Sequence, residues 1–203
     1  VFRDGRFTVA GTDRGVGFAE VARAAYAPRQ LPLGLEPGFS ETAAFTPPAV
    51  TFPNGCQVCE VEIDEETGVV RIVRHTVVDD VGRMVNPMLV KGQIHGGVVQ
   101  GLGQALFEDL VYDEAGQLVA GSFMDYAMPR ADDVPFFEVD SHEVPTQVNP
   151  LGAKGVGEAG TVGALPALVN AVNDALAPLG VRHLDMPMTA ERVWRAIQQA
   201  RRG

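Results

Sequence analysis

Residues 86–110 read NPMLVKGQIHGGVVQGLGQALFEDL, and large apolar side chains recur in this stretch every four residues. That spacing predicts an α-helix from about Met88 to Leu110. The repeating residues are Ile94, Val98, Leu102 and Leu106. The stretch also contains five glycines, and each costs a helix interior roughly 0.5–1 kcal/mol relative to alanine. They are Gly92, Gly96, Gly97, Gly101 and Gly103. Close approach of another backbone or of a ligand would offset this cost, and packing alone explains such glycines about as often as a ligand does.

The segments around this helix predict hairpins and further helices. Asp4-Gly5 lies between short apolar runs and predicts a tight hairpin, because both positions tolerate positive φ. A short helix should follow over 18–27 and end at Pro28. The remaining expected elements are strands at 58–63 and 69–78 joined by a turn at 64–68, a hairpin at 110–121, a strand at 136–144, and helices at 164–176 and 189–200, the last capped by Thr189. The predicted fold class is α+β, with mixed helices and antiparallel hairpins.

Three parts are expected along the chain. Residues 1–27 form the hairpin and helix, 28–55 form a proline-rich arm, and 56–203 form the main α+β core. The arm is too long for an ordinary connection, so we expect it to wrap over a neighbouring surface. Since Val1 is not a methionine and the chain starts inside a hairpin, we expect a fragment of a longer protein.

Composition excludes several classes of partner. The formal net charge of -10 over 203 residues argues against nucleic acid and anionic membranes as partners, because an acidic surface repels phosphates. No apolar run reaches the roughly 20 residues of a transmembrane segment, and residues 1–11 lack the apolar stretch of a signal peptide. We therefore expect a cytoplasmic protein. Cys56 and Cys59 form a lone C-x-x-C without the further ligands of a zinc site, which favours a structural role.

Residues 152–163, GAKGVGEAGTVG, carry the strongest chemical signal. The backbone N–H groups of such a loop, with the dipole of the following helix, suit an anion, and Lys154 adds a positive charge. Glu158 would repel that anion, so we expect it to face something else. A partly enclosed glutamate near a metal-bound oxygen can act as a general base. Residue chemistry alone favours the other interpretation, an acid paired with the helix dipole.

The string at 155–160, GVGEAG, also matches the dinucleotide fingerprint G-x-G-x-x-G. We reject that function because no hydrophobic strand precedes the loop and no acid follows at the required distance of about 20 residues. A phosphate-binding P-loop is rejected too, since no Gly-Lys-Ser/Thr follows.

Residues 92–103, GQIHGGVVQGLG, and 154–158, KGVGE, together resemble the molybdenum hydroxylases, the xanthine dehydrogenase and aldehyde oxidase family, in order and separation. Within that family the chain is most similar to the molybdopterin-binding large subunit of the aerobic carbon monoxide dehydrogenase type. Three short motifs reinforce the match, DDVG at 79–82, NP at 86–87 and NPLG at 149–152. The resemblance implies the C-terminal part of the molybdopterin-binding region.

The resemblance assigns a role to five residues. Glu158 falls on the family's catalytic base, which takes a proton from a hydroxyl at the metal. Gln93 matches the glutamine that approaches the cofactor, and an exposed polar helix residue is the alternative. Gly155, Val156 and Gly157 match the loop beside the cofactor, and no residue of this chain is implied to bind the metal. His95 departs from the acid often found in xanthine-type members, which argues against a purine substrate.

The resemblance also implies a cofactor and partners. The cofactor is molybdenum held by molybdopterin, commonly as the cytosine dinucleotide, and we expect none on the isolated chain, which should be inactive. The implied partners are a small-molecule substrate, iron-sulfur and FAD subunits or domains, and the remainder of the large subunit, in a hetero-oligomer. Neither cysteine matches the cysteine-bearing loop on which carbon monoxide oxidation depends. The rival hypothesis is a non-catalytic packing module in which Glu158 is a structural cap.

Overall fold

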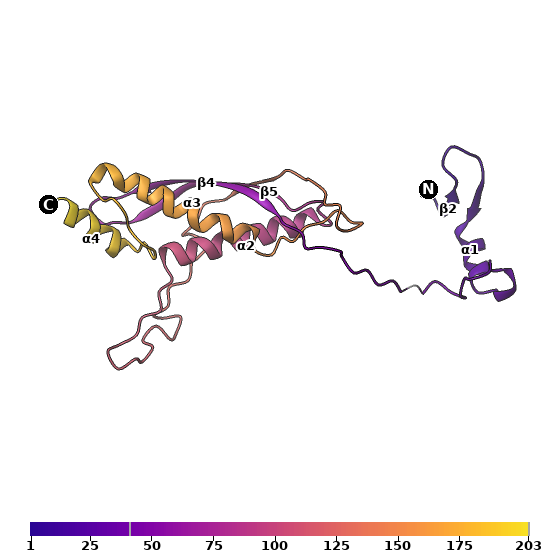
Figure 1. The fold of residues 1–203 in the computed structure, drawn as a ribbon, viewed down its shortest axis with the longest axis horizontal. Helices are drawn as coiled ribbons and strands as arrows, with labels where there is room; N and C mark the ends of the chain where they lie inside the picture. Colours follow the sequence, from indigo (N-terminus) through magenta and orange to yellow (C-terminus); the bar gives the residue numbers. More distant parts are fainter. Residues whose placement is uncertain (41, 203) are drawn as a thin grey trace. The chain divides into compact units, whose positions relative to one another are not determined.

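The structure, a computed structural model, describes residues 1–40 and 42–202 (Figure 1). Glu41, which falls in the predicted arm, and Gly203 lie outside the described residues. The chain divides into two compact units, Val1–Thr46 and Pro47–Gly203. Each unit is described by itself below.

The first unit is a small sheet followed by a helix. Its elements are β1 (Phe2–Arg3), β2 (Arg6–Thr8), β3 (Gly15–Gly17), α1 (Phe18–Ala25) and the 3-10 turn η1 (Pro28–Gln30). The expected hairpin turn is confirmed, with φ of 51° at Asp4 and 73° at Gly5. The sequence did not predict β3, which pairs antiparallel with β2. Helix α1 ends before Pro28, as expected.

The sheet of the second unit has three strands, β4 (Asn54–Ile63), β5 (Val70–Asp80) and β6 (Glu138–Ser141). Strands β4 and β5 form the expected antiparallel hairpin, with Gly68 in the left-handed region at φ 75°. Strand β4 begins four residues before the predicted Val58. Strand β6 lies within the strand predicted at 136–144, for which the sequence predicted no partner, and it runs parallel to β5. A long connection through α2 separates β5 from β6, which permits the parallel pairing.

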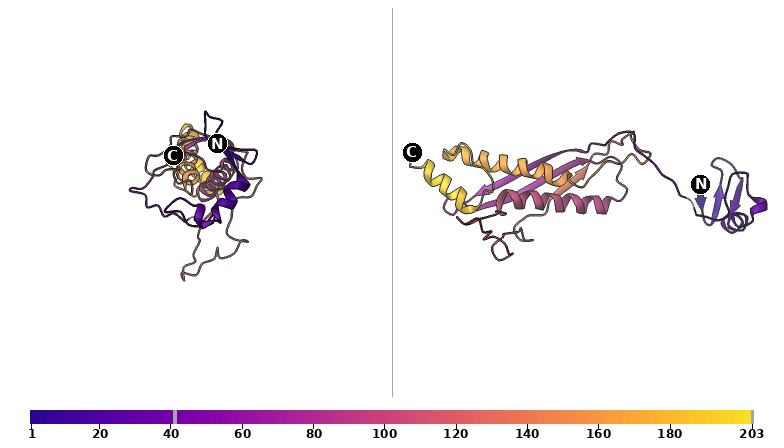
Figure 2. Two further views of the ribbon diagram at one scale, coloured as in Figure 1. Left: turned by 90° about the vertical axis from the view of Figure 1, so that its right-hand side faces the viewer. Right: turned by 60° about the horizontal axis from the view of Figure 1, so that its bottom comes forward.

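Two long helices, α2 (Pro87–Leu106) and α3 (Ala159–Leu176), pack against each other and against the sheet, running along the strands (Figure 2). Ile94, Val98 and Leu102 are buried, which confirms the predicted apolar face of α2. On α3, Leu168 and Val172 complete the core. The 21 residues Ala159–Leu179 are long and apolar enough to cross a membrane, but within this unit the apolar face of α3 is part of the protein core.

Glycines allow α2 and α3 to approach closely. A Cβ atom at Gly97 would lie 3.0 Å from the Thr161 nitrogen and 3.1 Å from the Gly160 Cα. A Cβ atom at Gly101 would lie 2.9 Å from the Cβ of Ala164. Packing therefore explains these two glycines of the predicted helix.

Two predicted elements are shorter in the structure than the sequence predicted. Helix α2 ends at Leu106 rather than Leu110, because the N–H groups of Phe107 and Glu108 both donate to the Gly103 carbonyl and turn the chain away. The hairpin expected at 110–121 is reduced to a single bridge between Tyr112 and Leu118, within a loop that extends away from the helices (Figure 1).

The C-terminal part keeps its predicted helices with one shift. Helix α3 starts at Ala159 rather than at residue 164, so the last part of the predicted glycine-rich loop is already helical. After the 3-10 turn η2 (Ala177–Leu179), helix α4 (Ala190–Ala200) closes one end of the core through Val193 and Ile197. The predicted N-cap is confirmed, since the Thr189 hydroxyl accepts from the Arg192 N–H.

Candidate active site

The segment that contains Glu158 starts at a fixed point beside the end of β5. Gly82 and Ala153 form an isolated antiparallel bridge. The N–H of Lys154 donates to the Val81 carbonyl at 2.8 Å. No side chain fits at Gly82, where a Cβ atom would lie 2.3 Å from a backbone oxygen of the loop, and its φ of 65° favours glycine. The backbone just before residue 155 is thus held to the sheet.

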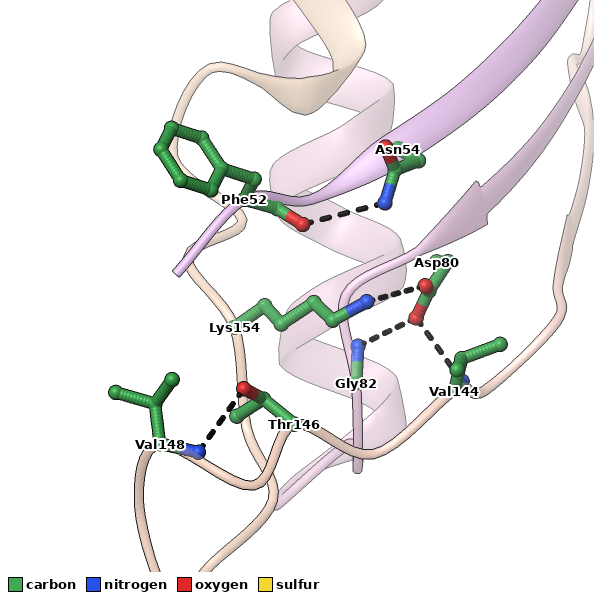
Figure 3. Close-up of polar contacts among 8 residues, drawn as sticks. All are labelled: Phe52, Asn54, Asp80, Gly82, Val144, Thr146, Val148 and Lys154. Atoms are coloured by element: carbon green, nitrogen blue, oxygen red, sulfur yellow. Dashed lines mark hydrogen bonds and ion pairs between the residues drawn. The ribbon is translucent and has the colours of Figure 1, made fainter. Parts of the chain in front are cut away.

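A nearly buried ion pair between Lys154 and Asp80 strengthens this attachment (Figure 3). The side chains are only 10% and 13% exposed. Burial alone would raise the pKa of Asp80, but hydrogen bonds from Lys154 Nζ and from the N–H groups of Val144 and Gly82 lower it to about 2. The prediction that Lys154 supplies a positive charge for an anion is therefore wrong, because Asp80 already neutralises that charge.

The segment ends at the first turn of α3, where α2 holds it. A Cβ atom at Gly160 would lie 2.4 Å from the Ile94 carbonyl oxygen, so only glycine fits at this contact. The Thr161 hydroxyl donates to the Gly97 carbonyl at 2.9 Å. Backbone and side chain together fix the residues that follow Glu158.

Glu158 occupies the N-cap position of α3, yet its side chain forms no capping hydrogen bond. It is exposed. The amide nitrogen of Gln93 donates to the carbonyl of Gly157, the residue before it, at 2.9 Å. The structure thus brings Gln93 next to the loop, as the resemblance implies, and gives its amide nitrogen a partner within the chain.

Two cavities lie against the segment 155–158. The first, of about 440 Å³, contains Glu158, Gly155 and Gly157 together with polar residues of β4 and β5. Its polar lining residues are Asn54, Gln57 and Asp79. The second, of about 360 Å³, contains Gln93 and Val156. The five predicted site residues therefore meet at one junction but line two cavities.

The glycines of the segment face open space. A Cβ atom at Gly155 or Gly157 would meet nothing within 4 Å, and neither φ lies in the left-handed region. The same holds for Gly92 and Gly96 on α2. Neither backbone conformation nor packing within the described residues requires glycine at these four positions.

Three polar residues of the site region escaped the sequence prediction. Asp79 is 2% exposed and lines the Glu158 cavity, and burial raises the pKa of its carboxyl. Gln57 and His75 hydrogen-bond to each other beneath the first turn of α3. Only Asp79 carried a signal, as part of the DDVG motif. Gln57 lies inside the C-x-x-C string and His75 lies in the neighbouring strand, and neither sequence pattern indicates a contact with α3.

The other notable residues lie away from this junction. The ring of His95 packs edge-on against Phe137 at 5.6 Å and does not belong to the lining of either cavity. Cys56 and Cys59 are free thiols on β4, and burial raises the pKa of Cys59 to about 11. Such a thiol is a poor nucleophile at neutral pH.

The two helices that cover the sheet leave a glycine loop open at their junction, where a ligand can approach the backbone closely. A family model described as molybdopterin cofactor-binding domain matches residues 1–135, well over half of the chain. The chain belongs to this family, which confirms the resemblance.

Individual relatives support this family membership. The chain is 41% identical over 195 residues to the carbon monoxide dehydrogenase large chain of Hydrogenophaga pseudoflava, covering 96% of this chain and 24% of that protein. It is 43% identical over 200 residues to the nicotine 6-hydroxylase large subunit of Paenarthrobacter nicotinovorans, covering 98% and 24%. The chain thus spans about a quarter of the length of these curated relatives.

Solved structures confirm the fold class. Quinoline 2-oxidoreductase from Pseudomonas putida 86 matches with a TM-score of 0.90 and 42% identity, over 98% of this chain and 26% of that one. A Cu,Mo-CO dehydrogenase matches with a TM-score of 0.88 and 38% identity, over 98% and 25%.

Proposed function

We propose that this chain is the part of a molybdenum-dependent hydroxylase large subunit that supplies the catalytic base, Glu158, and one wall of the active site. The observation that carries the proposal is the contrast within the loop. Its two flanks are fixed to β5 and α2, whereas Gly155, Gly157 and the Glu158 carboxylate face open space. A segment held in this way suits a catalytic group that must be rigid yet accessible.

The molybdenum-pterin cofactor fits beside this segment. Four glycines whose Cβ positions are empty, at 92, 96, 155 and 157, let a bulky group approach the backbone. We assign Gln93 and the backbone N–H groups of Gly155, Val156 and Gly157 to holding its polar edge. When bound, the cofactor supplies the redox chemistry and makes a water-derived hydroxyl acidic. In this subunit type we propose the cytosine dinucleotide form.

Glu158 then acts by accepting a proton at one of its carboxylate oxygens. Because its side chain makes no capping hydrogen bond, the carboxylate is not already committed to the helix terminus. Asp79 lines the same cavity, and its raised pKa keeps it neutral to a higher pH than an exposed aspartate. Asp79 is also almost fully buried, whereas Glu158 is exposed and can reach a bound molecule, which favours Glu158 as the base.

The activity belongs to a longer protein. We propose that the complete subunit is cytoplasmic and passes electrons from a small substrate to iron-sulfur and FAD subunits or domains. The remainder of the large subunit would cover the open side of the Glu158 cavity and complete the substrate site. The isolated chain is expected to be inactive.

Replacing Glu158 by Gln in the complete, cofactor-loaded subunit tests this function. We expect turnover per bound molybdenum to fall at least 100-fold, as loss of a general base requires. Molybdenum content should stay close to that of the unmodified enzyme, because glutamine keeps the shape of the side chain. The matched control is Glu60→Gln, which removes the same charge from an exposed position on β4.

The rival, a non-catalytic packing module, predicts unchanged turnover and weakened assembly for Glu158→Gln. Packing does explain Gly97 and Gly101. It leaves the open glycines unexplained, and the missing capping hydrogen bond of Glu158 counts against a structural cap.

A further inference from the structure

Gln57 reaches from the sheet to the turn that carries Glu158. Its Nε2 group donates to the backbone carbonyls of Ala159 at 3.3 Å and of Gly160 at 2.9 Å. These are the two residues directly after Glu158. Gln57 also lines the Glu158 cavity, so it approaches the turn from the cavity side, opposite the α2 contacts of Gly160.

His75 holds the other end of the Gln57 amide. Its Nε2 atom lies 2.9 Å from Gln57 Oε1. Because Gln57 Nε2 faces two carbonyl groups, Oε1 must be the acceptor here and His75 Nε2 must carry the hydrogen. His75 is fully buried, and burial lowers the pKa of its imidazole, which favours this neutral form. The ring is also held edge-on against Phe137 at 5.7 Å.

Helix α3 provides space for this contact. A Cβ atom at Gly163 would lie 2.6 Å from both Cδ and Nε2 of Gln57. Any other residue at 163 would therefore push the amide away from the first turn. The space at Gly163 and the carbonyl groups of Ala159 and Gly160 together accommodate the amide of Gln57.

We propose that Gln57, oriented by His75, is a positioning residue that fixes the direction of the Glu158 side chain during catalysis. Three side chains connect the backbone around Glu158 to its neighbours by hydrogen bonds: Gln93 to Gly157, Thr161 to Gly97, and Gln57 to Ala159 and Gly160. Gln57 is the one that comes from the sheet. A displacement of about 1 Å at a catalytic group can cost roughly 10²-fold in rate, so loss of this contact should be visible in turnover.

This inference rests on the proposed role of Glu158, and the experiment separates the two. In the complete, cofactor-loaded subunit, Gln57→Leu removes the amide while keeping a side chain of similar length. We expect kcat per bound molybdenum to fall about 10-fold or more, with KM and molybdenum content within about twofold of the unmodified enzyme. The control is Val58→Leu, the next residue on β4, which is 62% exposed and should leave all three quantities unchanged.

His75 provides a matched pair that does not depend on Gln57→Leu folding well. His75→Gln retains an N–H donor near the position of Nε2 and should keep most of the turnover of the unmodified enzyme. His75→Leu removes the donor and should lower kcat several-fold at equal molybdenum content. Equal kcat for these two variants would overturn the positioning role, as would a Gln57→Leu enzyme that loses molybdenum or stability but keeps normal turnover per molybdenum.

Glu158→Gln, measured in parallel, distinguishes the two failures. If it abolishes turnover while Gln57→Leu does not reduce it, Glu158 is the base and Gln57 does not position it. If Glu158→Gln retains turnover, the proposed function itself fails, and with it the role of Gln57.

Discussion

Two groups of glycines lie within a few residues of each other in this chain, and their surroundings differ completely. At Gly97, Gly101 and Gly160 a Cβ atom would meet neighbouring atoms at about 3 Å or less. At Gly92, Gly96, Gly155 and Gly157 it would meet nothing within 4 Å. The first group is explained by contact between α2 and α3. The second is required neither by backbone conformation nor by packing among the described residues, which is why we propose that it contacts the cofactor.

The first group of glycines lies where the backbone is held in place. The ion pair between Lys154 and Asp80 is the strongest contact that holds the segment before residue 155 to the sheet. Asp80→Asn would leave the nearly buried ammonium of Lys154 without a countercharge. We expect the free energy of unfolding of the chain to drop by about 3–5 kcal/mol. Chemical denaturation measures this, with the exposed Asp140→Asn as a control that should change it by less than about 0.5 kcal/mol. Equal values for both variants would contradict the proposed attachment.

Gly160 and Gly157 test the contrast between the two groups directly. In Gly160→Ala the new methyl group would collide with the Ile94 carbonyl of α2, so we expect a loss of about 1–3 kcal/mol. Gly157→Ala adds the same methyl group in open space and should change stability by less than about 0.5 kcal/mol. Equal losses in thermal or chemical unfolding would remove the distinction.

Acid should weaken the attachment between Lys154 and Asp80, because it protonates the Asp80 carboxylate. The pKa of Asp80 is about 2 in the folded chain against an ordinary value of 3.8, because the folded state stabilises its charged form. This contribution is complete above the ordinary value and is lost as the pH falls towards 2. The difference in stability between the unmodified chain and Asp80→Asn should therefore shrink across this range. A difference independent of pH would exclude the negative charge of Asp80 as its source.

The smallest expected effect has the opposite sign. Gly96→Ala places a methyl group in open space on α2 and removes a helix-destabilising glycine, so we expect a gain of about 0.5–1 kcal/mol in the isolated chain. In the complete subunit the same change should reduce cofactor content. Gly97→Ala, one residue along, should destabilise the isolated chain. Thermal unfolding of the two variants shows whether their changes in stability have opposite signs.

Local sequence patterns predicted much of this fold. The Asp4-Gly5 hairpin, the apolar face of α2 and the Thr189 cap follow from neighbouring residues, and the structure confirms them. Spatial contacts were not accessible in this way. The parallel pairing of β6 and the partnership of Lys154 with Asp80 join residues about 60 or more positions apart.

The candidate site shows the same division. Glu158, Gln93 and the loop glycines were predicted as site residues because two motifs resemble a family, and the structure brings them to one junction. Gln57 and His75 could not be found in this way, since their contacts with each other and with α3 exist only in the folded chain. The five glycines of α2 look alike in sequence, and only their neighbours in the fold divide them.

The central claim is that the segment 155–158 is left open for the cofactor. A structure of the complete large subunit with its molybdenum cofactor bound tests this most directly. We predict that Gly155 and Gly157 contact the cofactor and that the Glu158 carboxylate points into the same cavity as the metal. A structure in which other protein segments fill the space at these glycines and cover Glu158, with the cofactor elsewhere, would contradict the account.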